Sequence, residues 1–158
     1  MHTKTKIKIV DNFKLRLEID ELYEKMSQID VAKWSLIIAR HILEITGVEY
    51  ASIDVIVDGF HIDELWQIGK ASMYDVRQAG FRIHKLAREC DNEIQKAALR
   101  ATGQAVGSAH MREHSMVSSD YAIKTIGLLT SNNIEAITVE RMWQLNELRK
   151  IFKNSENL

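Results

Sequence analysis

The chain has 158 residues, and its 21 lysine and arginine side chains against 22 aspartate and glutamate side chains leave a net charge of -1. This length suits one domain, and the near-zero charge argues against a protein held to nucleic acid mainly by phosphate neutralisation. Cys90 is the only cysteine, which excludes an internal disulfide or a cysteine-rich zinc site and favours a reducing, cytoplasmic compartment. Because a signal-peptide core and an apolar run of ~20 residues are both missing, we expect a soluble protein with no membrane partner.

The first ten residues differ from the rest of the chain. Lys4, Lys6 and Lys8 alternate with uncharged residues, which is a strand-like period of two. With no second strand evident to pair with it, residues 1–10 are predicted to form an extended or frayed arm. Residues 11–158 are predicted to form a single all-α domain, a bundle of about six or seven helices, because proline is absent and apolar residues recur at helical spacing.

The helix boundaries follow from capping residues and glycines. The apolar stripe over residues 31–45 predicts a helix capped by Asp30 and ended by Gly47, and the stripe over 53–60 predicts a second helix ending near Gly59. A long helix is expected over 71–90, with Asp91 as the cap of the next one. The last helix is expected after the turn-like residues 131–133.

Small residues crowd the segment from residue 97 to residue 110. Alanine recurs every four residues, and Gly103 and Gly107 are also four apart. Glycine inside a helix costs about 0.8–1.0 kcal/mol relative to alanine, so two of them indicate a steric demand. We interpret this segment as a central helix tightly crossed by its neighbours.

Histidines follow that segment. His110 and His114 are four residues apart, and on an unbroken helix both rings would share one face, where they could bind a metal together with His41 or His84. With Glu113 the spacing also matches the H-x-x-E-H pattern of inverted zinc peptidases, so a metal-binding protein or a metal-dependent hydrolase is the alternative hypothesis. The other interpretation is a set of buried neutral histidines. No phosphate loop, dinucleotide fingerprint or nucleophile motif is present, so we expect no cofactor and no enzyme activity.

The segment 101–124 contains Ala-His at 109–110, a second histidine at 114 and Tyr-Ala-Ile-Lys at 121–124. With this pattern the segment resembles bacterial immunity proteins of the immunity-five-like type. Their signature is a small-residue helix ending in Ala-His, a second histidine four residues later, and Tyr-Ala-x-Lys. Those positions are His110, His114, Tyr121 and Lys124 in this sequence. Members usually carry prolines after their first long helix, whereas this chain has none, which makes it a divergent member. The resemblance implies a non-catalytic protein that binds and blocks a cognate toxin, and it transfers no catalytic residues.

An acidic stretch is our candidate for the toxin-binding surface. No lysine or arginine lies between Arg40 and Lys70, and several acids do. Charge complementarity speeds encounter with a partner, and aromatic side chains anchor interfaces. The candidate residues are Asp54, Asp58, Asp63, Glu64 and Trp66. The alternative is a solvated face balanced by basic residues of other helices. A third hypothesis is a structural module that forms a homodimer through exposed aromatic and methionine side chains.

Overall fold

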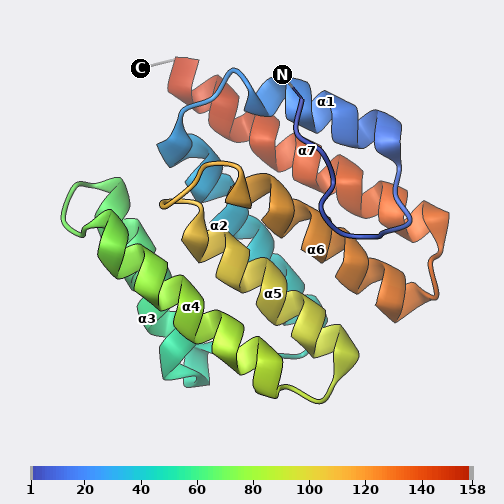
Figure 1. Cartoon of the computed structure of the whole chain (residues 1–158). Helices are drawn as coiled ribbons and strands as arrows, with labels where there is room; N and C mark the ends of the chain where they lie inside the picture. Colours follow the sequence, from blue (N-terminus) through green and yellow to red (C-terminus); the bar gives the residue numbers. More distant parts are fainter. Residues whose placement is uncertain (1, 157–158) are drawn as a thin grey trace.

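The computed structural model describes residues 2–156, and these fold into seven α-helices joined by short connections (Figure 1). In chain order the elements are α1 (Phe13–Tyr23), α2 (Gln28–Ile45), the 3-10 turn η1 (Tyr50–Ser52), α3 (Asp54–Gln67), α4 (Met73–Glu89), α5 (Glu93–Gly107), α6 (His114–Thr130) and α7 (Ile134–Glu156). The predicted all-α fold is confirmed. None of the described helices is long and apolar enough to cross a membrane.

Helix α5 lies at the centre of the bundle. It packs against α4 on one side, α6 on the other, and α2 behind, and α3 covers α4 while α1 covers α7 (Figure 1). The alanines of α5 are buried, so the neighbouring helices approach its backbone closely, as the small-residue pattern predicts. Trp34 of α2 is fully buried, and its indole N–H donates to the carbonyl of Gln144 in α7 at 2.9 Å.

Several helix ends differ from the predicted ones. Helix α2 is capped by Ser27 rather than Asp30, because the Ser27 side chain accepts the backbone N–H of Asp30. Helix α5 is capped by Asn92 rather than Asp91, because the Asn92 side chain accepts the backbone N–H of Gln95. Helix α3 continues through Gly59. A Cβ at Gly59 would lie 2.7 Å from Ile83 Cδ1, so this glycine permits the contact between α3 and α4 and does not end a helix.

The connection between α5 and α6 breaks the helix that would have carried both histidines. Helix α5 ends at Gly107 and α6 begins at His114. The amide of Gln28 donates to the carbonyls of Ser108 and Ala109 at 3.0 and 2.8 Å. The guanidinium of Arg112 lies 4.1 Å from the centre of the Tyr23 ring and donates to two carbonyls beside α1. These contacts with distant parts of the chain fix the turn.

The N-terminal arm is tied to the bundle. The backbone N–H of Thr3 donates to Asp20 at 2.7 Å, and Asp11 at the end of the arm accepts from Arg141 of α7. Residues 2–12 contain no helix, and the arm crosses the side of the bundle that α1, α6 and α7 form (Figure 1).

Candidate functional site

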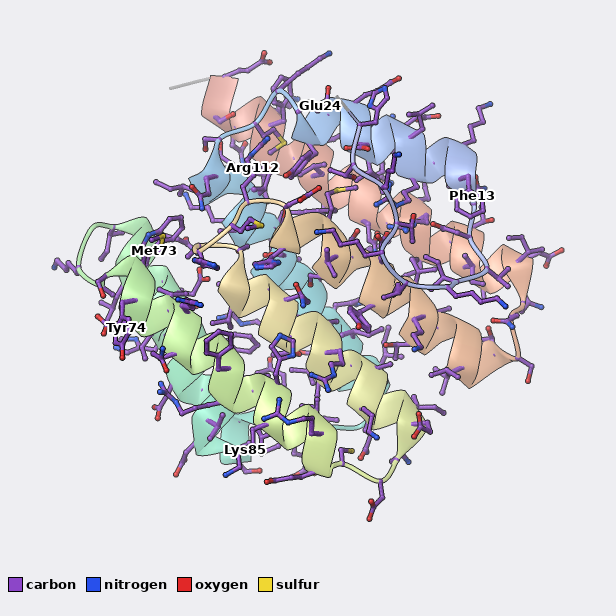
Figure 2. All side chains as sticks on the ribbon, in the orientation of Figure 1. Phe13, Glu24, Met73, Tyr74, Lys85 and Arg112 are labelled. Atoms are coloured by element: carbon purple, nitrogen blue, oxygen red, sulfur yellow. The ribbon has the colours of Figure 1, made fainter. Side chains whose placement is uncertain are left out.

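A pocket of about 380 Å³ lies between α4 and α5. The connection from α5 to α6 and the first residue of α6 complete its wall. Met73 and Lys85, labelled in Figure 2, mark the direction of α4 along one side of the pocket. Its basic lining consists of Arg77, His84, Arg88, Arg100, His110 and His114.

Three of the four candidate histidines line this pocket, and the fourth does not. The ring centroids of His110 and His114 are 6.0 Å apart, and His84 reaches the pocket from α4. His41 lies elsewhere: its ring stacks on Trp143 at 3.8 Å, and its Nε2 is 3.1 Å from a carboxylate oxygen of Glu140. The fold therefore brings together His84, His110 and His114 without forming the unbroken helix that the sequence suggested.

One glycine of α5, Gly103, makes room for a histidine ring, whereas a Cβ at Gly107 would only reach ordinary contact with another. A Cβ at Gly103 would lie 2.6 Å from Cε1 of His84, and a Cβ at Gly107 would lie 3.4 Å from Cδ2 of His114. Any side chain at Gly103 would displace the His84 ring. The steric demand inferred from the two glycines is thus partly a demand of this pocket.

The electrostatics of the pocket are those of an anion site. Burial, and after it the charge of Arg100, lower the pKa of His84 to about 4. Accordingly Nδ1 of a neutral His84 lies 3.1 Å from the Arg100 guanidinium and can accept its hydrogen bond. Burial and the neighbouring His110 also lower the pKa of His114. No carboxylate from residues 2–156 lines the pocket, so the three guanidinium groups set its charge.

This charge opposes metal binding by the three histidines. Glu113, the acid of the H-x-x-E-H match, is 3.5 Å from Lys6 of the arm. Within residues 2–156, the side chains close enough together to offer three ligands to one ion are His2, Asp20 and Glu24, none of which is among the predicted candidates. The pocket therefore suits an anionic ligand better than a cation.

The five residues of the predicted acidic surface do not share one environment. Asp54 and Asp58 are exposed on α3 and have no ion pair within residues 2–156, whereas Glu64 is exposed and pairs with Arg40. Trp66 is partly buried against the core. Asp63 is fully buried and accepts a hydrogen bond from Gln67 at 2.9 Å, so its carboxyl group lies away from the exposed face.

The rest of the signature segment lies on α6. Tyr121 is partly buried, and the Lys124 ammonium lies 6.0 Å from the centre of its ring. Asp120, one position before Tyr121, is buried and accepts hydrogen bonds from Arg16 and Arg141. Sequence reasoning missed this pair of arginines, because only the tertiary structure brings α1, α6 and α7 together around one carboxylate.

Sequence reasoning also missed the pocket arginines, although a signal was present. Arg77, Phe81, His84 and Arg88 follow one another at steps of four, three and four residues, which places them along one stripe of α4. The partner side chain Arg100 is on α5, and its approach to that stripe depends on the packing of the two helices.

The comparison with protein families decides the identity at family level. A family model described as "Imm-5 like putative immunity protein" matches residues 21–151. The chain belongs to this family. The match runs from the end of α1 into α7, so this Imm-5-like protein has both the α4–α5 pocket and the signature segment inside the matched region. The comparisons with curated proteins and with solved structures found no match.

Proposed function

We propose that this Imm-5-like protein binds a cognate bacterial toxin in the cytoplasm of the producing cell and blocks it without catalysis. The match to the immunity family over residues 21–151 carries this proposal. The fold supports it, because helices packed around a buried core present a preformed surface that pays little ordering entropy on association.

The outer face of α3 is the toxin-binding surface in this proposal. Asp54 and Asp58 are one helical turn apart, exposed and free of ion pairs within residues 2–156, and Val57 beside them is 41% exposed. Unpaired surface charges attract an oppositely charged partner over a distance of about 10 Å at moderate salt. A basic toxin surface, such as one that binds nucleic acid, has the complementary charge.

Growth rescue tests the function itself. A candidate toxin, sought among the genes neighbouring the one for this chain, is expressed in a sensitive bacterial host with and without the immunity chain. We expect the chain to restore growth and to co-purify with the toxin at a fixed stoichiometry. Continued growth arrest in the presence of well-folded chain would contradict the proposal.

Association kinetics test the surface. Asp58→Lys should slow association with that toxin about tenfold or more at low salt, because it removes one attractive charge and adds a repulsive one. Glu21→Lys is the matched control: Glu21 is an exposed residue of α1, away from α3, and its substitution changes the net charge by the same amount. Equal association rates for the two variants would assign toxin binding to another face.

A further inference from the structure

The arginines of the α4–α5 pocket lack the acidic partners that other arginines of the chain have. Arg16, Arg40, Arg141 and Arg149 each form an ion pair with a carboxylate. In the pocket, Arg77 lies over the Phe81 ring at 5.2 Å and Arg100 contacts His84. Arg88 has no hydrogen bond or ion pair to any of residues 2–156. Three guanidinium groups thus line one pocket with no negative charge from those residues to balance them.

Two more side chains of the same pocket have unused polar atoms. Nδ1 of His110 and Oε1 of Gln104 are buried and have no hydrogen-bond partner among residues 2–156. Within residues 2–156, the other buried side-chain atoms without a hydrogen-bond partner are carboxylate oxygens. In each of these carboxylates the other oxygen does form a hydrogen bond; the residues are Asp20, Asp63 and Glu140. Buried polar groups normally find partners, so a polar ligand would complete the pocket.

The pocket has the size and layout of a small-molecule site. Its volume of about 380 Å³ lies in the range of ligand pockets. Arg88 and Arg100 lie toward one end, and Arg77 lies about 16 Å from Arg88 along α4, toward His110 and His114. Phe81, which is 50% exposed, supplies an apolar surface between the two ends.

We propose that the α4–α5 pocket binds a phosphoryl group, either free phosphate or the phosphate of a small organic molecule, between Arg88 and Arg100. The planar guanidinium group donates two parallel hydrogen bonds to phosphate oxygens, and arginine is favoured wherever that geometry is used. Gln104 can turn its amide to donate through nitrogen. The site is independent of the proposed toxin surface, which lies on α3.

Thermal unfolding of the full chain tests this site. Melts are recorded in inorganic phosphate, in adenosine 5′-monophosphate and in adenosine, at constant ionic strength set with potassium chloride. We expect the unfolding midpoint to rise by about 5–10 °C at a phosphate-bearing ligand concentration about 100 times its dissociation constant. Adenosine alone should give a smaller rise or none. A larger effect of the monophosphate would assign the site to an organic phosphate, and an equal effect to free phosphate.

Two variants and one control distinguish specific phosphate binding in the pocket from nonspecific attraction of anions to positive charge. Arg88→Gln and Arg100→Gln should each weaken binding about tenfold or more, since each loses a hydrogen bond between charged groups. Arg88 is exposed and unbonded to the described residues, so its substitution should leave the fold intact. Arg82→Gln removes the same charge from α4 outside the pocket and should bind as the parent chain does. No midpoint shift in the parent chain, or an equal loss in Arg82→Gln, would overturn the proposal.

Discussion

Asp63 is the acidic side chain of α3 that turns inward. It is fully buried, one carboxylate oxygen accepts from Gln67, and the other has no hydrogen-bond partner in the described part of the chain. Burial raises the pKa of Asp63 to about 7, because the charged form loses its hydration. The side chain therefore titrates near neutral pH, unlike its exposed neighbours on α3.

The raised pKa gives a stability prediction. The folded state holds the Asp63 proton up to about pH 7, whereas the unfolded chain releases it near pH 4. The contribution of this bound proton to the free energy of unfolding is present in full below about pH 4 and is lost as pH rises through 7. We expect the stability advantage of Asp63→Asn over the parent chain to be about 2 kcal/mol larger at pH 8 than at pH 5.

Urea unfolding at the two pH values measures this difference. The lowered pKa of His84 acts with the opposite sign, since it removes stability as pH falls from about 6.5 toward 4. This effect is common to both chains and cancels in the comparison. An equal stability difference at pH 5 and pH 8 would show that Asp63 does not titrate in this window.

At the scale of the elements, the contact between α4 and α5 depends on residues without side chains. A Cβ at Gly80 would lie 3.4 Å from the carbonyl oxygen of Gly103, and a Cβ at Gly103 would collide with the His84 ring. The two helices therefore meet backbone to backbone at one position and backbone to imidazole at the next. The same contact holds His84 at the edge of the pocket.

We expect Gly103→Ala to destabilise the chain by about 1–3 kcal/mol, because the added methyl group displaces a half-buried ring. In an exposed helix the same change would stabilise by about 1 kcal/mol. In a His84→Ala background the collision is gone, and Gly103→Ala should become neutral or stabilising. Chemical denaturation of the four chains in this double-mutant cycle measures the coupling, and an identical effect in both backgrounds would contradict the packing argument.

At the scale of the whole molecule, a buried ionic network joins the N-terminal arm to three helices. Arg141 of α7 is fully buried, and its Nε and Nη2 donate to the two carboxylate oxygens of Asp11 at 2.9 and 2.7 Å. It also donates to Asp120 of α6 at 2.7 Å, and Arg16 of α1 donates to the same carboxylate. Ser119 and Gln144 accept the remaining N–H groups of Arg141. Every side-chain N–H group of Arg141 therefore has an acceptor.

Arg141→Met should cost about 3–5 kcal/mol of unfolding free energy, because it leaves the Asp11 carboxylate buried without its cation. The matched control is Arg149→Met on the same helix, where an exposed ion pair with Glu18 at 3.5 Å is worth at most about 1 kcal/mol. Adding Asp11→Asn to Arg141→Met should recover part of the loss. Equal unfolding midpoints in urea for Arg141→Met and Arg149→Met would refute the role of the network.

Local sequence patterns are enough to predict the all-α class and the family of this chain. Helical periodicity and the absence of proline are local properties, and the signature around His110 and Tyr121 is contiguous. The same local rules placed the start of the last helix correctly at Ile134, directly after the turn. These rules misplaced the N-cap of α2 by three residues. They also ended α3 at Gly59, because they could not show that this glycine accommodates Ile83 of another helix.

Which charged groups meet depends on how the helices pack. Asp63 carries the same charge as Asp54 and Asp58 in the sequence, yet the packing of α3 buries one and exposes the others. The candidate histidines divide in the same way, with His41 against Trp143 and the other three around the α4–α5 pocket. Burial and long-range pairing depend on how helices that are distant in the sequence cross each other. The sequence pattern predicts only the face of its own helix on which each residue lies.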